Sequence, residues 1–469
     1  MRTYHHVQED TIQALQEIVG AKYVYTDKDK KIPYASDEGV GTGKNCLPEV
    51  VVLPKTTEEV SAVMKLANEA LIPVVPRGAG TGLEFGAVVN ELGGIVLSTE
   101  RINQILEFDA DKMYMVVEPG VITAQLQAMA KEKGLLYAGD PCSGDSCFIG
   151  GNAATNAGGN RAVKYGTTRD QIYSIEVVTP TGDIAHFGSR LKKVTAGYPL
   201  EKIIIGSEGT LGIITKLTLK LVPLPQHTMD ILAVFPTLDQ ALSLVTALPK
   251  AGITPTCLEC MDNEVIRVVE QYLDEKQPYS DNGNYMIIQI DGKTEEAVED
   301  ACMAIDDICR VQGALEVFAA DAAKVWKARI AFTEASAAEC PVAAMEDYVV
   351  PPDQLLALLQ RLEEIGRQQG VHFRGVSHAG DGNLHLDVLR RGFTAAEEET
   401  KIAAFEDAAC QAVYELGGRI SGEHGIGQKR KALFAKYTDP GALALMKAVK
   451  KAFDPHMILN PGKLFDIED

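Results

Sequence analysis

The spacing of hydrophobic residues along the chain changes between the period of a helix and that of a strand. Near the N-terminus, Ile12, Leu15, Ile18 and Val19 recur at helical spacing. Asp10 stands just before this stripe and can cap a short amphipathic helix. We therefore expect residues 1–45 to form an N-terminal helical segment.

A strand–helix–strand pattern follows this segment. The apolar run 50–53 predicts a buried strand, and Thr56 with Glu59 forms the capping box of an amphipathic helix that reaches about Leu71. Residues 72–75 predict a second strand. This βαβ unit indicates that the first domain is of the α/β type.

The rest of the chain mixes both kinds of element. Apolar or alternating runs predict strands at 175–178, 203–205, 211–221, 285–290 and 385–389, and amphipathic runs predict helices at 238–248 and 354–369. Pro223 and Pro225 interrupt the pattern and mark a boundary. We expect a first domain over 46–225, a second, α+β domain over 226–410, and a C-terminal segment over 411–469.

Composition limits the class of protein. With 469 residues, 46% hydrophobic and 23% charged, the chain resembles a soluble globular protein with two or three cores. Its net charge of −20 argues against general nucleic-acid binding, which needs a surplus of basic residues. Seven basic residues nevertheless gather near the C-terminus around one acid, Asp439: Lys429, Arg430, Lys431, Lys436, Lys447, Lys450 and Lys451. They form either a solvated helix face or a docking or phosphate-binding surface.

The N-terminus has no apolar signal region, and no apolar run approaches the ~18 residues of a membrane span, so we expect a cytoplasmic protein that is at most peripheral to a membrane. Its nine cysteines are odd in number and scattered, which suits a reducing compartment. Cys257 and Cys260 form a lone CxxC, and we interpret them as buried thiols.

Three segments of the first domain are rich in glycine and small residues. Residues 76–82 (PRGAGTG) follow a strand directly, but the GxGxG spacing and the missing helix start exclude a dinucleotide fingerprint of the Rossmann type. Residues 150–159 (GGNAATNAGG) and 207–213 (SEGTLGI) are the other two. Such segments let the backbone approach a phosphate or a planar cofactor closely.

Histidines flank a turn sequence in the second domain. Residues 380–383 (GDGN) favour a tight turn that can bring His378 and His385 to one side. Glu423 is the natural third ligand of a metal site, and the adjacent His424 is then available as a general base. The alternative is that each is an ordinary loop or core residue.

The chain resembles a known flavoprotein family. The runs at 76–82, 149–153 (IGGNA), 156–159 (NAGG), 206–213 (GSEGTLGI) and 460–463 (NPGK) look like those of the vanillyl-alcohol-oxidase-type FAD-binding fold. The pattern is similar to the branch of FAD-linked D-lactate dehydrogenases, glycolate oxidases and D-2-hydroxyglutarate dehydrogenases, and it extends from Pro48 to Lys463. The resemblance implies an α+β protein with a two-part FAD-binding domain (46–225), a substrate or cap domain (226–410) and a C-terminal segment (411–469) that returns to the flavin site.

The resemblance also implies which residues hold FAD. We expect contacts from Pro76, Arg77, Gly78, Ala79, Gly80, Thr81, Gly82, Pro119, Gly120, Asp140, Pro141, Ser143, Gly150, Gly151, Asn152, Asn156, Gly158, Gly159, Glu208, Gly209, Gly212, Ile213 and Asn460. Some relatives attach FAD covalently through a His or Cys, but 76–82 and 150–159 contain neither, so we expect non-covalent FAD. Cys142 and Cys147 are the nearest alternative attachment points.

A short helical motif supplies the substrate anchor. Arg329 stands three residues after Trp326, and Thr333 follows four residues later, so both would share one helix face. Spacing alone favours a solvated Arg329, whereas the family's Trp-x-x-Arg element implies that it binds the substrate carboxylate. The lysine that accompanies a second substrate carboxylate in D-2-hydroxyglutarate enzymes is missing from residues 344–347 (AMED), which favours a short acid.

The resemblance implies a flavin dehydrogenase of small D-2-hydroxy acids, with D-lactate first and glycolate second. His378, His385 and Glu423 would hold Zn²⁺, Mn²⁺ or Fe²⁺, and His424 would remove the hydroxyl proton. The family's His-x-Gly-Asp-Gly-Asn-x-His pattern is preceded by Ser377, where many relatives have Gly, and this hydroxyl could crowd or hydrogen-bond the first ligand.

No iron–sulfur or haem motif is present, so O₂, a quinone or a separate protein would accept the electrons. The resemblance favours a protein partner, with an electron-transferring flavoprotein first and iron–sulfur subunits second. Two rival functions are a redox-neutral FAD transferase of the ether-lipid synthase type and a non-catalytic flavin subunit of a glycolate oxidase complex.

Overall fold

The computed structural model describes residues 4–40 and 46–466, which divide into two compact units. Unit 1 comprises Met1–Ala157, Thr167–Leu224 and Glu423–Asp469. Unit 2 comprises Gly158–Gly166 and Pro225–Gly422. Unit 2 thus extends past the expected boundary at 410, because α15 (Ala395–Glu415) packs on α14 (Leu355–Gln369) and buries Ile402 and Phe405.

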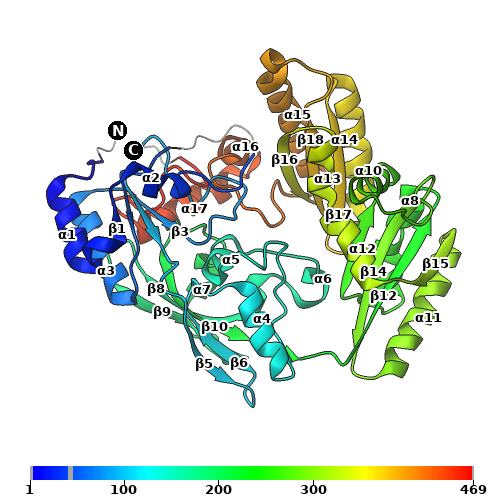
Figure 1. Ribbon diagram of the computed structural model, residues 1–469, viewed down its shortest axis with the longest axis horizontal. Coiled ribbons are helices and arrows are strands. Elements are labelled where there is room, and N and C mark those ends of the chain that lie inside the picture. Colours follow the sequence, from blue (N-terminus) through cyan, green and yellow to red (C-terminus); the bar gives the residue numbers. More distant parts are fainter. Residues whose placement is uncertain (1–3, 41–45, 467–469) are drawn as a thin grey trace. The chain divides into compact units, whose positions relative to one another are not determined.

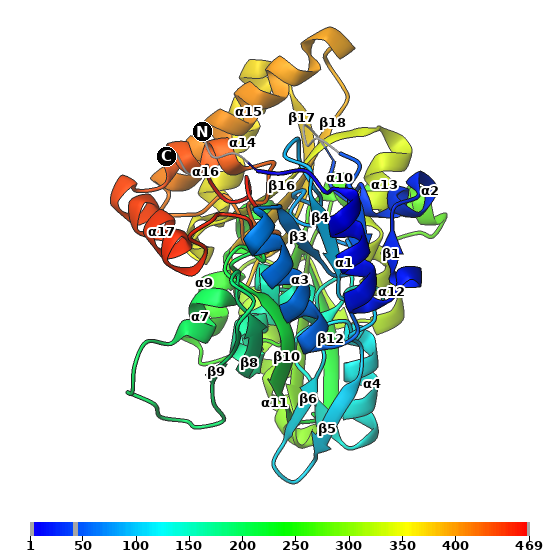
Figure 2. The same cartoon turned by 90° about the vertical axis from the view of Figure 1, so that its left-hand side faces the viewer.

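Unit 1 begins with a four-stranded sheet of order β1-β2-β4-β3, in which β2 and β3 run parallel to β4. Its elements are α1 (Glu9–Val19), β1 (Val24–Tyr25), α2 (Lys28–Lys31), β2 (Val50–Val52), α3 (Thr57–Ala70), β3 (Val74–Arg77) and β4 (Ile95–Ser98). Helices α1 and α3 lie side by side and bury their apolar stripes against this sheet (Figure 2). Thr56 caps α3 as predicted, with its hydroxyl accepting from Glu59 N at 3.2 Å, but the Glu59 carboxylate accepts from Lys55 N rather than from Thr56 N. The helix predicted near the N-terminus is present as α1, but its predicted cap was wrong, because Gln8 is the N-cap and Asp10 lies in the first turn.

The second sheet of unit 1 has five antiparallel strands in the order β5-β6-β10-β8-β9. They are β5 (Ile105–Asp109), β6 (Tyr114–Val117), β8 (Ile172–Val178), β9 (Ile184–Gly188) and β10 (Ile213–Lys220), with β7 (Leu135–Leu136) paired to β11 (Val222–Pro223). The helices are α4 (Thr123–Glu132), α5 (Ile149–Thr155), α7 (Leu200–Ile204), α16 (Lys431–Tyr437) and α17 (Pro440–Phe453). The strand predicted at 203–205 was therefore wrong. Three apolar residues are too few to separate a helix from a strand.

Unit 2 is built on a seven-stranded antiparallel sheet of order β15-β12-β14-β13-β17-β18-β16 (Figure 1). The strands are β12 (His227–Phe235), β13 (Cys257–Met261), β14 (Asn284–Gly292), β15 (Glu316–Ala319), β16 (Val342–Val349), β17 (His372–His378) and β18 (Asn383–Leu389). The remaining helices are α6 (Ala162–Tyr165), α8 (Leu238–Leu242), α9 (Leu244–Lys250), α10 (Asn263–Leu273), α11 (Glu295–Val311), α12 (Ala322–Ile330) and α13 (Phe332–Glu339).

Alternation along β17 separates the two faces of this sheet. Val376 belongs to the core formed with α10, α12 and α13, whereas Phe373 stacks on Phe405 of α15. Because side chains alternate along a strand, His378 lies on the face of Val376 and Ser377 on the opposite face. The Ser377 hydroxyl therefore does not crowd His378, contrary to the expectation from sequence. By the same alternation, Cys257 and Cys260 lie on opposite faces of β13, and none of the nine cysteines, all of which lie within the described residues, forms a disulfide.

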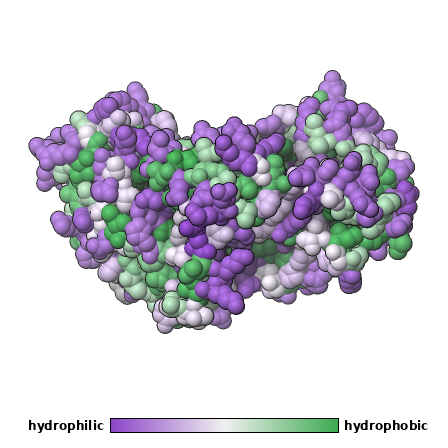
Figure 3. Space-filling model, turned by 90° about the horizontal axis from the view of Figure 1, so that it is seen from below, coloured by the Kyte–Doolittle hydropathy of each residue, from purple (hydrophilic) through white to green (hydrophobic). Residues whose placement is uncertain are grey.

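Within residues 4–40 and 46–466, no helix is both long and apolar enough to cross a membrane. On the face drawn in Figure 3, hydrophilic and hydrophobic side chains are interspersed over the coloured residues.

Candidate active site

In unit 1, the backbone brings the glycine-rich segments together. Gly78 lies against Gly151, since a Cβ built on Gly78 would be 3.7 Å from the Gly151 Cα. Gly150 N donates to Pro119 O at 2.8 Å, and Glu208 N donates to Ala154 O at 2.7 Å. A Cβ on Gly151 would meet nothing within 4 Å, so this position borders open space. A backbone that borders open space is what close approach to a flat or phosphate-bearing ligand requires.

Asn460 joins the C-terminal segment to these loops. Its side-chain amide donates to Gly86 O at 3.0 Å and to Glu208 O at 2.8 Å. Lys450 of α17 donates to Thr210 O at 2.7 Å and to Leu459 O at 2.8 Å. The segments 206–213 and 460–463, which are far apart in sequence, are therefore fixed to each other.

Buried charges support this region from inside the protein. The Arg77 guanidinium donates to Ala87 O at 3.2 Å and to Pro33 O at 3.1 Å, so its side chain is used to hold the loop. The Glu208 carboxylate accepts from Ile426 N at 2.8 Å and from Gly427 N at 2.7 Å. Burial raises the pKa of Glu208 in spite of these two backbone donors. Any contact of Arg77 or Glu208 with FAD is thus expected from the backbone.

In unit 2, the His-turn-His segment is the hairpin between β17 and β18. Gly382, at φ +82°, donates its N–H to His378 O at 3.1 Å, which closes the predicted turn. His378 pairs with Asn383 across the hairpin, and the rings of His378 and His385 meet edge to face with centroids 5.0 Å apart. The turn therefore brings the two imidazoles together, as the sequence predicts.

A buried carboxylate that was not predicted from the sequence lies beside the first histidine. Glu259 of β13 pairs with His378 across the sheet, and its Oε1 lies 2.8 Å from His378 Nδ1. Its Oε2 accepts from Arg329 Nε at 2.9 Å and lies 2.8 Å from Arg329 Nη2. Burial alone would raise the pKa of Glu259, but the charges of His378 and Arg329 and their hydrogen bonds together lower it. Glu259 is therefore held as a carboxylate.

A second unpredicted carboxylate, Asp347 of β16, holds the loop that precedes the Glu-His pair. Its Oδ2 accepts from Ser421 Oγ at 2.8 Å and from Gly422 N at 2.9 Å, and its Oδ1 accepts from Asn383 Nδ2 at 2.7 Å. Val349 and Arg419 form a β-bridge just before this loop. The end of unit 2 is thus anchored two and three residues before His424.

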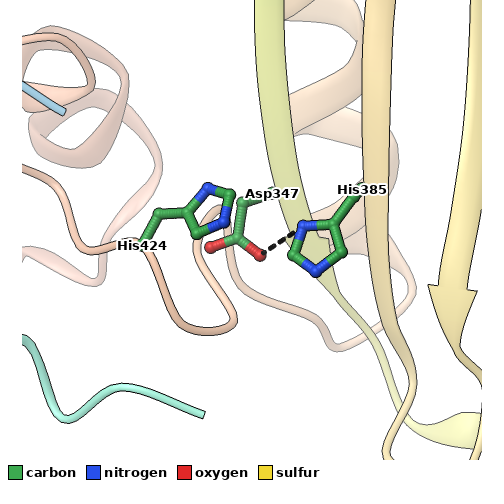
Figure 4. A group of neighbouring side chains, drawn as sticks. All are labelled: Asp347, His385 and His424. Carbon is green, nitrogen blue, oxygen red and sulfur yellow. Dashed lines mark ion pairs between the residues drawn. The ribbon is translucent and has the colours of Figure 1, made fainter. Parts of the chain in front are cut away.

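Two groups of side chains have the spacing of a metal site. His378, His385 and Glu423 form one group, and Asp347, His385 and His424 form the other, with ligand atoms within 4.8 Å of one another in each. Figure 4 shows the second group, in which Asp347 Oδ1 lies 3.8 Å from His385 Nδ1.

The hydrogen bonds favour the first group. His378 donates a hydrogen bond from Nδ1 to Glu259. This is the usual way in which a protein orients a histidine that binds a metal through Nε2. Both oxygens of Asp347 already accept hydrogen bonds. We therefore propose His378, His385 and Glu423 as the ligands. Two imidazoles and one carboxylate form a donor set that suits Zn²⁺, Mn²⁺ or Fe²⁺.

Comparisons with known proteins agree with this architecture. Residues 48–188 match the FAD binding domain family, and residues 224–464 match the C-terminal domain of FAD linked oxidases. The chain is 37% identical over 98% of both chains to a D-lactate dehydrogenase of Anaerostipes hadrus. It is also 37% identical to the glycolate oxidase subunit GlcD of Bacillus subtilis, over 89% of both. The chain belongs to the FAD-linked oxidase family.

The fold of this FAD-linked oxidase also has solved relatives. A structure of p-cresol methylhydroxylase superposes with a TM-score of 0.82 at 18% identity and covers 99% of each chain. The expected α+β, vanillyl-alcohol-oxidase-type fold is thereby confirmed. The gathered glycine segments with open space beside Gly151 fit FAD, which the matched domain binds.

Other predicted site residues of this FAD-linked oxidase lie in a second helix or in a loop. Arg329 and Thr333 lie on two different helices rather than on one, because α12 ends at Ile330 and α13 begins at Phe332. Asp140, Pro141 and Ser143 lie in a loop held at the start of α4, where Ala124 N donates to Gly144 O at 2.9 Å. The roles of Thr333 and of this loop stay predictions.

The basic C-terminal residues serve different purposes. Arg430 forms a buried ion pair with Glu84 at 2.9 Å, Lys450 is buried, and Lys431 pairs with Asp466. Lys451 is exposed on α17. The stretch is therefore neither a uniform solvated face nor a uniform docking surface.

Proposed function

We propose that this protein is an FAD-dependent dehydrogenase that oxidises a small D-2-hydroxy acid to the 2-oxo acid. The observation that carries the proposal is the buried arrangement Arg329–Glu259–His378 beside His385 and Glu423. It combines a cation suited to a carboxylate with a donor set suited to a divalent ion, as a metal-chelated 2-hydroxy acid requires. The relatives named for D-lactate and glycolate oxidation support the same substrate class.

The proposed roles follow from the chemistry of each side chain. Arg329 binds the substrate carboxylate through the edge of its guanidinium that faces away from Glu259. His424 takes the proton of the C2 hydroxyl, for which an imidazole is suited near neutral pH. A divalent ion would stabilise the alkoxide, and FAD would accept the C2 hydride when bound.

The size of the acid is suggested by one position on β16. Met345 lies two residues before Asp347 and so shares its face of the sheet. A thioether there offers no charge to a second carboxylate. We therefore propose D-lactate as the first substrate and glycolate as the second.

Anaerobic titration tests this function directly. Addition of D-lactate to the purified holoprotein should bleach the flavin absorbance, and L-lactate or D-2-hydroxyglutarate should do so much less. His424→Ala should retain FAD but lose at least about 100-fold in the bleaching rate, the usual contribution of a general base. His372→Ala, an exposed histidine on β17, is the matched control and should react like the parent. Equal bleaching in His424→Ala would remove His424 from the mechanism.

We further propose that a separate acidic redox protein, such as an electron-transferring flavoprotein, takes the electrons at α17. The exposed residues of this helix include an apolar one, Leu445, which is 70% exposed, and a basic one, Lys451, on a protein of net charge −20. The same helix is fixed through Lys450 to the segments that we expect to hold the flavin.

The double change Leu445→Asp and Lys451→Glu should slow electron transfer to such a partner at least tenfold, while reduction of a small dye stays unchanged. Lys250→Glu, an exposed lysine of unit 2, is the control. If the partner and the dye respond equally, α17 is not the docking surface.

A further inference from the structure

A carboxylate inside a central strand needs a reason to be there. Glu259 has 0% exposure, and its neighbours on β13 (Leu258, Cys260 and Met261) are apolar and buried. A buried charge costs several kcal/mol unless partners compensate it, and an apolar residue at such a position is often neutral or better for stability. Stability alone therefore does not explain a glutamate at this position.

The two oxygens of Glu259 serve two different residues of the site. Oε1 accepts a hydrogen bond from His378 Nδ1, and Oε2 accepts one from Arg329 Nε. If Glu259 served only to form an ion pair, Arg329 alone would be a sufficient partner. If it served only to orient a histidine, His378 alone would be sufficient. One carboxylate thus fixes the ring orientation of a proposed metal ligand and the fork of the proposed substrate anchor.

Each contact limits the side chain in a useful way. With Nδ1 bound to Glu259, Nε2 is the His378 nitrogen that would meet a metal. The edge of the Arg329 guanidinium that carries Nε is bound to Glu259 and is not available to a substrate. A substrate carboxylate would therefore bind the remaining N–H groups of Arg329. The edge-to-face contact between His378 and His385 further restricts the first ring.

We infer that Glu259 is a positioning residue that aligns the metal ligand His378 and the carboxylate anchor Arg329 together. The inference rests on the proposed function, because it assigns Glu259 to that same site. Its consequence is that metal affinity and substrate affinity depend on one side chain. Loss of the carboxylate should weaken both, even though Glu259 itself need touch neither the ion nor the acid.

Glu259→Gln separates these contributions. A glutamine oxygen can accept from His378 or from Arg329, and its amide then faces a donor on the other side. We expect Co²⁺ affinity, followed by the absorbance of the bound ion, to fall roughly 10- to 100-fold. We expect KM for D-lactate to rise at least about tenfold, with FAD content unchanged. Asp230→Asn is the matched control, because Asp230 is a buried acid of the same sheet that accepts from Trp326 and Gln289.

A second variant guards against a folding defect. In Glu259→Gln with Arg329→Met, the glutamine oxygen is left to His378, so Co²⁺ affinity should return to within about threefold of the parent while KM stays raised. Unchanged Co²⁺ affinity in Glu259→Gln would overturn the inference. Failure of the double variant to recover it would also do so.

The proposed function fails separately, if the parent protein binds Co²⁺ but no 2-hydroxy acid bleaches its flavin. The Co²⁺ titrations then still decide whether Glu259 positions His378.

Discussion

Lys450 offers a sharp test of how the C-terminal helix is attached. Its ammonium donates to Asp454 Oδ2 at 2.6 Å as well as to the carbonyls of Thr210 and Leu459. Asp454 is fully buried and also accepts from Leu459 N at 2.9 Å. Lys450→Met keeps most of the side-chain volume but removes all three donors. It leaves a buried carboxylate without its cation.

The cost can be worked out from these contacts. Breaking a buried pair by removing one partner costs about 3–5 kcal/mol, against a total of roughly 5–15 kcal/mol for a typical domain. For a unit of this size, about 2–4 °C is lost per kcal/mol, so the melting temperature of unit 1 should fall by roughly 6–20 °C. FAD should also be released at lower urea concentration, because segments 206–213 and 460–463 lose their shared anchor.

The assay is urea and thermal unfolding of the holoprotein, followed by flavin fluorescence and circular dichroism. Lys451→Met is the matched control, since this exposed neighbour should change the unfolding free energy by less than about 0.5 kcal/mol. Lys450→Met with Asp454→Asn should recover part of the loss, because the uncompensated charge is gone. If Lys450→Met unfolds like Lys451→Met, the reasoning about the buried lysine is refuted.

Three further predictions concern single positions. In Asp347→Asn, the new side chain cannot accept hydrogen bonds from Asn383 and from both loop donors, Ser421 and Gly422. Each charge-assisted bond contributes about 1.5–3 kcal/mol, so Co²⁺ affinity should fall at least about tenfold. An unchanged Co²⁺ titration would show that the loop does not need this anchor. Gly151 lies in α5 beside open space, so Gly151→Ala should raise the unfolding free energy of the apoprotein by about 0.5–1 kcal/mol. The added methyl group should weaken FAD binding, measured by fluorescence quenching. Unchanged FAD affinity would show that the cofactor binds elsewhere. Burial lowers the pKa of Lys463 from 10.5 to about 8, so between these pH values the folded state binds fewer protons than the unfolded state. The unfolding free energy of the apoprotein should therefore rise by about 2 kcal/mol from pH 8 to pH 10. Lys463→Met should lack this rise, and equal pH dependence in the two proteins would contradict the prediction.

Local sequence signals predicted the parts of the fold that local chemistry decides. The Thr56 cap and the turn at residues 380–383 were correct, because a hydroxyl before a helix and glycines around an Asx residue act within a few residues. The short apolar run at 203–205 was misinterpreted as a strand, because its length carries no period. Hydrophobic spacing therefore needs more than one turn or two alternations to be decisive.

The two carboxylates that organise the site could not be selected from the sequence. Glu259 contacts His378 on a strand that is more than a hundred residues away in sequence, and the residues of β13 do not indicate this partner. Asp347 was visible only as part of a segment that lacked a lysine. The basic stretch was ambiguous for the same reason, because burial of Arg430 and Lys450 depends on partners far away in sequence.

The division of the chain between the two units has a consequence for synthesis. Residues 158–166 and 225–422 complete unit 2, whereas unit 1 still lacks 423–469 when Gly422 is made. Ile458 and Leu459 belong to the core of the first sheet, and Leu459 bridges to Val74 of β3. At ~5–20 residues per second, β3 would wait roughly 20–80 seconds for this neighbour. The later-encoded unit should thus mature first during synthesis, and the flavin should bind only after the segment that contains Leu459 has been made.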